Sequence, residues 1–171
     1  GTVRHDTYEG IANAEESIVC SITEKRSLKE IKEMYKTQFR EVLANSIRKN
    51  RELLEKLGLD LQEIFKNVWP LILKESESRA ASLHSFMEMH LVYGRDLWEK
   101  LTPKIKSEYR IESEALQLRG IIDQLEIYEH GFVPVELKTG KAPKNDVWEN
   151  HKIQLGAYAL LLEECFQIPI K

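Results

Sequence analysis

The sequence predicts an α+β fold in which a long helical region precedes a small β-sheet and a closing helix. Apolar residues recur at helical spacing between residues 27 and 102, whereas over residues 115–138 they alternate with polar residues, as in half-buried strands. The chain has 171 residues and is 42% hydrophobic, which is enough apolar material for one core. We therefore expect a single domain.

Capping signals divide the first part of the helical region. A short helix is expected over residues 3–14. Ser27 and Glu30 form a capping box that begins a long helix, and Gly58 suits the left-handed residue that ends it.

The second part begins at Asp60, which with Glu63 starts another helix. Pro70 is expected to kink or end this helix, because proline lacks the backbone N–H that a helix needs. A further helix is expected over residues 78–101, with Pro103 closing it.

The period of the apolar pattern changes after the helical region. Alternation over residues 115–129 predicts a strand, His130-Gly131 supplies a tight turn, and residues 132–138 return as the second arm of a hairpin. A helix follows over residues 147–165, and residues 166–171 begin another strand.

The hairpin contains charged residues where a buried strand should be apolar. Glu136 and Lys138 are two positions apart and therefore share one face of their strand, and Asp123 interrupts the apolar run of the other arm. If pairing brought Asp123 and Glu136 to about 4 Å, their repulsion would reach about 4 kcal/mol at an effective dielectric near 20. A protonated carboxyl, a cation such as Lys138, or a divalent metal would offset it, and only the metal also supplies chemistry.

Other polar groups lie near these acids in the sequence. Gln154 and Tyr158 are four residues apart and lie on one face of the expected helix. The net charge of -3 argues against binding nucleic acid through overall positive charge. A local basic cluster of Lys138, Lys141, Lys144 and Lys152 is interrupted by two acids, a pattern that is also common on ordinary solvated surfaces.

An acid on one strand, E-x-K on the next and Q-x-x-x-Y on the following helix resemble the RecB-like branch of the PD-(D/E)xK nuclease superfamily. The stretches GIIDQLEI, VPVELKTGK and HKIQLGAYALLLEE are most similar to the nuclease domain of the eukaryotic and archaeal replication helicase-nuclease and to the CRISPR-associated RecB-like exonucleases. The resemblance implies a restriction-endonuclease-like core with a small mixed sheet flanked by helices. Residues 1–26 would then hold the histidine motif, residues 27–102 a large helical insertion, and residues 103–171 the hairpin and the QxxxY helix.

The resemblance also implies metal-dependent hydrolysis of phosphodiester bonds and a role for each matching residue. The metal ligands would be His5, Asp123, Glu136, the backbone carbonyl of Leu137 and, as a further acid, Glu108. Lys138 would act with Asp123 and Glu136 in catalysis, and the nucleic-acid contacts would be Gln154, Tyr158, Lys141, Lys144 and Lys152. His5 is preferred because Gly1 and His5 match the G-x-x-x-H pattern of the family, and His84 or His90 is the alternative.

The implied cofactor is Mg²⁺ or Mn²⁺. Relatives often carry a 4Fe-4S cluster on four cysteines, but Cys20 and Cys165 occupy neither of its regions, so we expect two buried, reduced thiols and no cluster on this chain. A cluster in the full-length protein would need cysteines outside these residues. The sequence is expected to be a portion of a longer protein, because it begins at the histidine motif and ends soon after the QxxxY helix.

The expected function is that of a DNA nuclease, either a single-stranded DNA exonuclease or a flap nuclease, in CRISPR adaptation or in DNA replication and repair. Its partners would be DNA with single-stranded regions and either a helicase region or a CRISPR integrase. No apolar run approaches the length of a membrane span, so we expect a cytoplasmic protein, or a nuclear one in a eukaryote. The alternative is a non-catalytic nucleic-acid-binding module that retains the nuclease fold. A helical interaction scaffold is a third hypothesis, and it leaves the hairpin acids unexplained.

Overall fold

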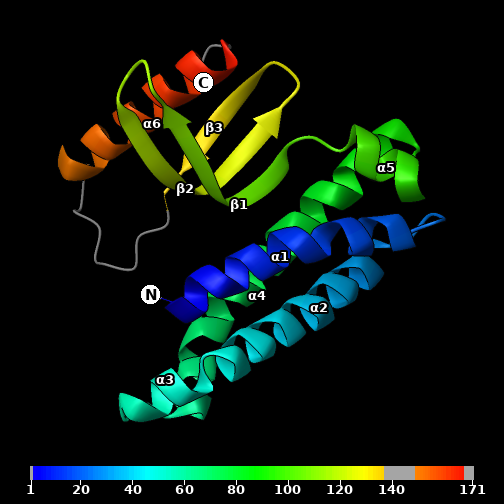
Figure 1. Ribbon diagram of the computed structural model, residues 1–171. Helices are drawn as coiled ribbons and strands as arrows, with labels where there is room; N and C mark the ends of the chain where they lie inside the picture. The colour runs from blue at the N-terminus through cyan, green and yellow to red at the C-terminus, as the bar shows by residue number, and fades with distance from the viewer. Residues whose placement is uncertain (1, 137–148, 168–171) are drawn as a thin grey trace. The chain divides into compact units, whose positions relative to one another are not determined.

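The computed structural model describes residues 2–136 and 149–167. The chain divides into two compact units, which we call the helical unit (Gly1–Leu101) and the sheet unit (Thr102–Lys171). In the described residues five helices are followed by three strands and a sixth helix. Figure 1 labels these elements along the chain. None of the helices in these ranges combines the length and the apolar character that crossing a bilayer requires.

The helical unit begins its second and fourth helices where the sequence predicts. Its elements are α1 (Thr2–Ser21), α2 (Leu28–Lys49), α3 (Arg51–Lys56), α4 (Leu61–His90) and α5 (Gly94–Lys100). The capping box is confirmed, because the Ser27 side chain accepts from the Glu30 N–H while the Glu30 carboxylate accepts from the Ser27 N–H. Asp60 likewise caps α4 by accepting from the Glu63 N–H at 2.8 Å.

The ends of two helices differ from the prediction. The first helix continues beyond residue 14 to Ser21, because Ile18 and Val19 are buried and extend its apolar face. The helix expected to run as far as Gly58 is broken at Asn50, and Gly58 then has the left-handed φ of 68° that only glycine adopts without strain.

Pro70 does not end its helix. The α4 helix passes through Pro70 as one element of 30 residues. Proline removes a single backbone hydrogen bond, and the buried side chains that follow it, including Ile72, Leu83 and Met87, hold the next turns in the core. The break comes instead at Leu91, whose φ of 52° ends α4 before α5 begins.

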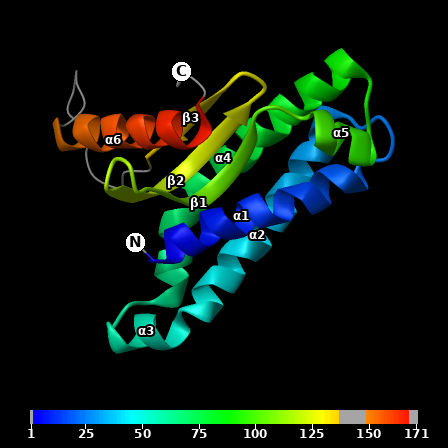
Figure 2. The same cartoon turned by 45° about the horizontal axis from the view of Figure 1, so that its top comes forward.

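The core of the helical unit is built where α1, α2 and α4 pack together. Figures 1 and 2 both show α1 and α2 running side by side. Gly10 allows this approach, since a Cβ at that position would lie 2.6 Å from Val42 Cγ1. Tyr35, Phe39 and Leu43 of α2 are fully buried in the resulting core.

A buried polar network joins these three helices. Arg79 of α4 forms ion pairs with Glu15 of α1 at 2.6 Å and with Glu75 of its own helix at 2.8 Å. The Tyr35 hydroxyl donates to the Glu15 carboxylate at 3.2 Å. Burial and the nearby Glu15 charge raise the pKa of Tyr35 well above its ordinary value, so this hydroxyl keeps its proton and acts as a donor.

The sheet unit consists of β1 (Lys104–Ser113), β2 (Leu118–Tyr128), β3 (Gly131–Val135) and α6 (Glu149–Phe166). The described strands form an antiparallel sheet in the order β1-β2-β3. The predicted hairpin is confirmed as β2 and β3, whereas β1 was not predicted. The last helix extends to Phe166, and residues 168–171, where another strand was expected to continue, lie outside the described residues.

The α6 helix covers one face of this sheet, as Figure 1 shows. Its Tyr158, Leu161 and Leu162 join Ile122 and Leu125 of β2 in one core cluster. Ile122 and Leu125 are three positions apart, although strand residues on one face are normally two apart. The alternation therefore shifts by one residue between them, at Asp123 and Gln124.

The expectation of two buried thiols holds only in part. Cys20 in α1 is half-buried, but Cys165 in α6 is exposed, and neither takes part in a disulfide. The Cys165 thiol donates to the Glu112 carbonyl at 3.3 Å.

Candidate metal centre

Three acidic residues occupy one row across the sheet. The register of β1 and β2 pairs Ser107 with Gln124 and Tyr109 with Ile122, which places Glu108 directly opposite Asp123. On the other side of β2, Gln124 pairs with Val135, so Glu136 follows β3 at the level of Asp123. The row runs Glu108, Asp123, Glu136, with Asp123 in the middle.

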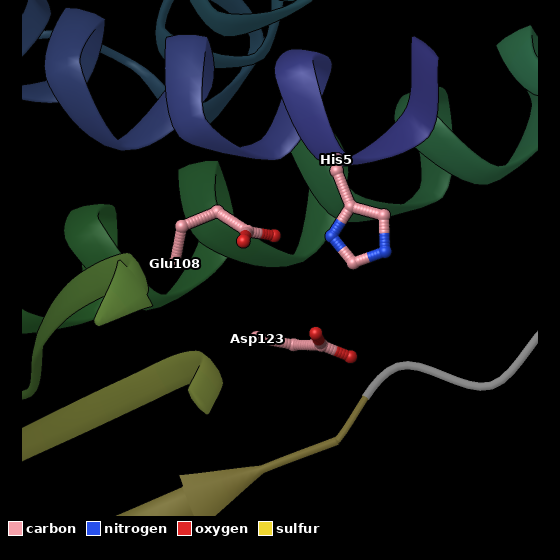
Figure 3. A group of neighbouring side chains, drawn as sticks. All are labelled: His5, Glu108 and Asp123. Atoms are coloured by element: carbon pink, nitrogen blue, oxygen red, sulfur yellow. The ribbon is translucent and has the colours of Figure 1, made fainter. Parts of the chain in front are cut away.

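The first two acids approach each other closely. A carboxylate oxygen of Glu108 lies within 4.8 Å of one of Asp123. Figure 3 shows the side chains of Glu108 and Asp123. The third residue drawn there, His5, belongs to the helical unit. Asp123 is only 8% exposed, and Glu108 and Glu136 are half-buried. Two carboxylates at this distance repel each other by about 3.5 kcal/mol at an effective dielectric near 20.

The backbone of Glu108 is in an unfavourable conformation. Its φ is 50°, in the left-handed region that residues other than glycine rarely adopt in a strand. Such a conformation costs about 1–3 kcal/mol, and residues that adopt it cluster at active sites and ligand-binding positions. It occurs at the residue that faces Asp123, where the strand alternation also shifts.

The third acid is held by the QxxxY face of α6. The Gln154 side-chain amide donates to a Glu136 carboxylate oxygen at 2.9 Å and to the Tyr158 hydroxyl at 2.9 Å. The Tyr158 hydroxyl in turn donates to the Ile121 backbone carbonyl at 2.6 Å. Through these bonds Gln154 and Tyr158 of α6 connect the end of β3 to the centre of β2. They also fix the position of the Glu136 carboxylate.

Gly120 makes this connection sterically possible, and the sequence reasoning missed it. A Cβ at Gly120 would lie 2.7 Å from Tyr158 Cε1 and 3.3 Å from Tyr158 Cδ1. The absence of a side chain on β2 therefore leaves the space that the tyrosine ring occupies. A glycine inside a strand pattern is the available signal, because it often marks the close approach of another group.

The candidate histidines all lie in the helical unit. His5 is on α1 and exposed, and His84 is half-buried on α4. His90, the last residue of α4, is exposed and its ring lies 4.1 Å from that of Phe86. The two rings are tilted by 33°, a local packing contact between neighbouring turns of α4.

Several predicted site residues cannot be placed. Leu137, Lys138, Lys141 and Lys144 lie outside the described residues. Lys152 is described and is exposed near the start of α6. The structure thus brings together Glu108, Asp123, Glu136, Gln154 and Tyr158 within the sheet unit.

The chemistry of the acid row fits a hard divalent cation. Carboxylate oxygens are the ligands that Mg²⁺ and Mn²⁺ prefer, and Mg²⁺ binds them at about 2.1 Å in an octahedron. Two oxygens on one such ion are at most about 4.2 Å apart. The Glu108 and Asp123 oxygens, within 4.8 Å, need to close by about 0.6 Å at most to share an ion.

Two curated proteins share part of the sequence. The chain is 38% identical over 80 residues to a CRISPR-associated exonuclease Cas4/endonuclease Cas1 fusion of Leptospira interrogans, a match that covers 42% of this chain and 15% of that protein. It is 43% identical over 63 residues to the protein of the same name from Myxococcus xanthus, a match that covers 34% of this chain and 11% of that protein. The matches thus span less than a sixth of either relative. No solved structure matches the chain.

A protein family matches nearly the whole length of the chain. Its description is PD-(D/E)XK nuclease superfamily, and the match extends over residues 7–169. This range includes all three acids of the row and the Gln154-Tyr158 face of α6. The match also confirms the expected restriction-endonuclease-like α+β fold. The chain belongs to the PD-(D/E)XK nuclease superfamily.

Proposed function

We propose that this protein is a metal-dependent deoxyribonuclease that hydrolyses phosphodiester bonds in single-stranded DNA or at single-stranded DNA ends. The observation that carries the proposal is the row of Glu108, Asp123 and Glu136 across neighbouring strands, in a chain of nuclease ancestry. Like charges that face each other across strands repel. A shared divalent cation removes that repulsion and also supplies a reaction.

Asp123 and Glu136 would hold Mg²⁺ or Mn²⁺, with Glu108 as a further ligand. Such an ion supplies Lewis acidity, which makes water a better nucleophile and offsets the charge that develops on the phosphate. Gln154 keeps one oxygen of Glu136 in a fixed direction through its 2.9 Å hydrogen bond, and it is itself oriented by Tyr158. The backbone carbonyl of Leu137 is proposed as another ligand.

Lys138 would orient the attacking water and stabilise the negative charge of the transition state. The proposal rests on the E-x-K spacing of Glu136 and Lys138 in the sequence, since residues two apart share a side in extended backbone. Lys141, Lys144 and Lys152 would contact phosphates of the bound strand.

His5 is proposed as the histidine ligand of the metal. The G-x-x-x-H match supports His5, and the contact between the His90 and Phe86 rings argues against His90. Replacing His5 with Ala should weaken Mn²⁺ binding at least tenfold in isothermal titration calorimetry, whereas His84→Ala should leave it unchanged. The reverse result would assign the ligand to His84.

The experiment that tests the function is cleavage of 5′-labelled single-stranded DNA in the presence of Mn²⁺ or Mg²⁺. Asp123→Asn and Lys138→Ala should each lower the rate by roughly 100-fold or more, because each removes a group that stabilises transition-state charge. Glu126→Gln, an acid three residues further along β2, is the matched control and should cleave as the wild type does.

Circular dichroism establishes that each variant is folded. Unchanged cleavage by both Asp123→Asn and Lys138→Ala would contradict the proposal, because the activity would then come from another site or a contaminant. Metal-independent DNA binding without any cleavage by the wild type would favour the non-catalytic module instead.

We further propose that the nuclease acts in CRISPR adaptation, with a Cas1-type endonuclease as its partner. The names of the two relatives support this role over one in replication and repair, because both join an exonuclease to a Cas1 endonuclease in one chain. The test is co-elution of this protein with the Cas1 protein of the same genome in size-exclusion chromatography. Independent elution of the two at micromolar concentration would count against the partnership.

A further inference from the structure

The tip half of the β1-β2 hairpin presents a charged strip on the sheet face away from α6. Tyr109, Ile111 and Ile122 belong to the core under α6, so their neighbours along the strands point the other way. Two cross-strand pairs therefore face outward, Arg110 with Ile121 and Glu112 with Arg119. All four side chains are exposed, and Ile121 keeps 43% of its surface accessible.

This strip continues the acid row. Glu108 precedes Tyr109 and Asp123 follows Ile122, so both acids lie on the same face as Arg110 and Ile121. At about 3.3 Å per residue, the Arg110-Ile121 pair is about 7 Å from the acid row along the strands, and the Glu112-Arg119 pair is about 13 Å from it. The two arginines are diagonal neighbours with Cβ atoms about 7–8 Å apart.

The strip is also concave. Arg110, Glu112, Arg119 and Ile121 line a cavity of about 570 Å³, together with Ile111 and Gly120. A cavity that combines two guanidinium groups with an exposed aliphatic side chain suits a phosphodiester strand. Guanidinium groups bind phosphate oxygens in a planar, two-pronged geometry, and an apolar side chain can contact a sugar or base between them.

We propose that this strip, with Arg110 and Arg119 as its phosphate contacts, carries the nucleic-acid strand to and from the acid row. The inference rests on the proposed function, since it takes the acid row to be the place of cleavage. It assigns substrate contacts to the β1-β2 hairpin, separate from the lysines that surround the ExK segment and the start of α6. Glu112 opposes Arg119 across the strands and would weaken the attraction for phosphate at the outer end of the strip.

The test is binding of a fluorescein-labelled oligothymidine of about 20 nucleotides, followed by fluorescence anisotropy. Binding is measured in EDTA on the Asp123→Asn protein, so that cleavage does not interfere. Each phosphate contact to a single strand contributes about 0.7 to the slope of log affinity against log salt. The double variant Arg110→Ala/Arg119→Ala should therefore lower the slope by about 1.4 and the affinity by roughly 25-fold at about 0.1 M salt.

Two further variants complete the design. Glu112→Gln should tighten binding by about fivefold, because one opposing charge is removed. Arg48→Ala removes the same charge as each strip variant from an exposed position on α2 and should leave the affinity unchanged.

Equal binding by the double variant and its parent would overturn the inference, and so would an equal loss in Arg48→Ala. These outcomes are distinct from failure of the proposed function, which would appear as absence of cleavage by the wild-type protein. A wild type that cleaves DNA, with a double variant that binds as tightly as its parent, would leave the nuclease proposal intact and reject the strip alone.

Discussion

Replacing Gly120 with Ala is expected to displace the tyrosine that connects α6 to the sheet. The new methyl carbon would lie 2.7 Å from Tyr158 Cε1 and 3.3 Å from Tyr158 Cδ1. Carbon atoms in ordinary contact are about 3.5–4.0 Å apart, so the ring has to move by about 0.8 Å or more. Such a shift strains the 2.6 Å hydrogen bond to Ile121 and, through Gln154, moves the Glu136 carboxylate.

Three contributions determine how much Gly120→Ala changes the free energy of unfolding. Overpacking of a filled site costs about 1–3 kcal/mol, and losing the hydrogen bond to Ile121 costs about 0.5–1.5 kcal/mol. Alanine also has less backbone entropy than glycine in the unfolded chain, which offsets about 0.4–1 kcal/mol of this loss of stability. We expect Gly120→Ala to lower the free energy of unfolding by about 1–3 kcal/mol, and to lower kcat/KM by at least about tenfold because Glu136 is misplaced.

Urea denaturation followed by circular dichroism measures the first effect, and the DNA cleavage assay measures the second. Gly156→Ala is the matched control, since no atom lies within 4 Å of a Cβ at that position in α6. It should stabilise the protein by about 0.5–1 kcal/mol, because alanine favours a helix interior more than glycine does. A Gly120→Ala protein that is as stable as the wild type would refute the argued role of Gly120.

Three further predictions concern the helical unit. Arg79→Ala should lower the free energy of unfolding by about 3–5 kcal/mol in urea denaturation, because it leaves Glu15 buried without its cation, and a loss below 1 kcal/mol would contradict this. Ser27→Ala should cost about 1 kcal/mol in the same assay by removing the N-cap of α2, whereas Ser27→Asp should restore most of it. The pKa of Tyr35 is raised in the folded protein above its ordinary value of 10.0. Above pH 10 the unfolded chain therefore releases a proton that the folded protein keeps. The free energy of unfolding should fall as pH rises beyond that value. Tyr35→Phe should flatten this part of the stability-pH curve, and an unchanged slope would contradict the assignment.

The sequence was sufficient to predict the hairpin and its acids. Near alternation over β2 identifies the strand, and an acid such as Asp123 inside an apolar run indicates a functional position. The capping residues Ser27 and Asp60 were also predicted, because their hydrogen bonds are local and depend only on the next three residues.

Other features depend on contacts that are distant in sequence. The β1 strand alternates Ile105, Tyr109 and Ile111 with charged residues, but Ser107 and Ser113 fall at the same alternating positions and dilute the apolar signal. The continuous α4 helix reflects burial of the residues that follow Pro70, which outweighs the local effect of proline.

The acid row could be predicted only in part. The resemblance to known nucleases suggests Glu108, but its place opposite Asp123 follows from the register of β1 on β2, which no local pattern specifies. Likewise, the i and i+4 spacing of Gln154 and Tyr158 predicts a shared face, whereas their bonds to Glu136 and Ile121 require the packing of α6 on the sheet.

The most direct test of the account is calorimetric titration of Mn²⁺ into the folded protein, with no DNA present. The wild type is expected to bind the ion, and Asp123→Asn and Glu136→Gln are each expected to weaken binding by roughly tenfold or more, since each removes a charged oxygen ligand. Glu126→Gln should bind as the wild type does. Equal Mn²⁺ affinity in all four proteins would contradict the claim that the carboxylates of neighbouring strands share one metal ion.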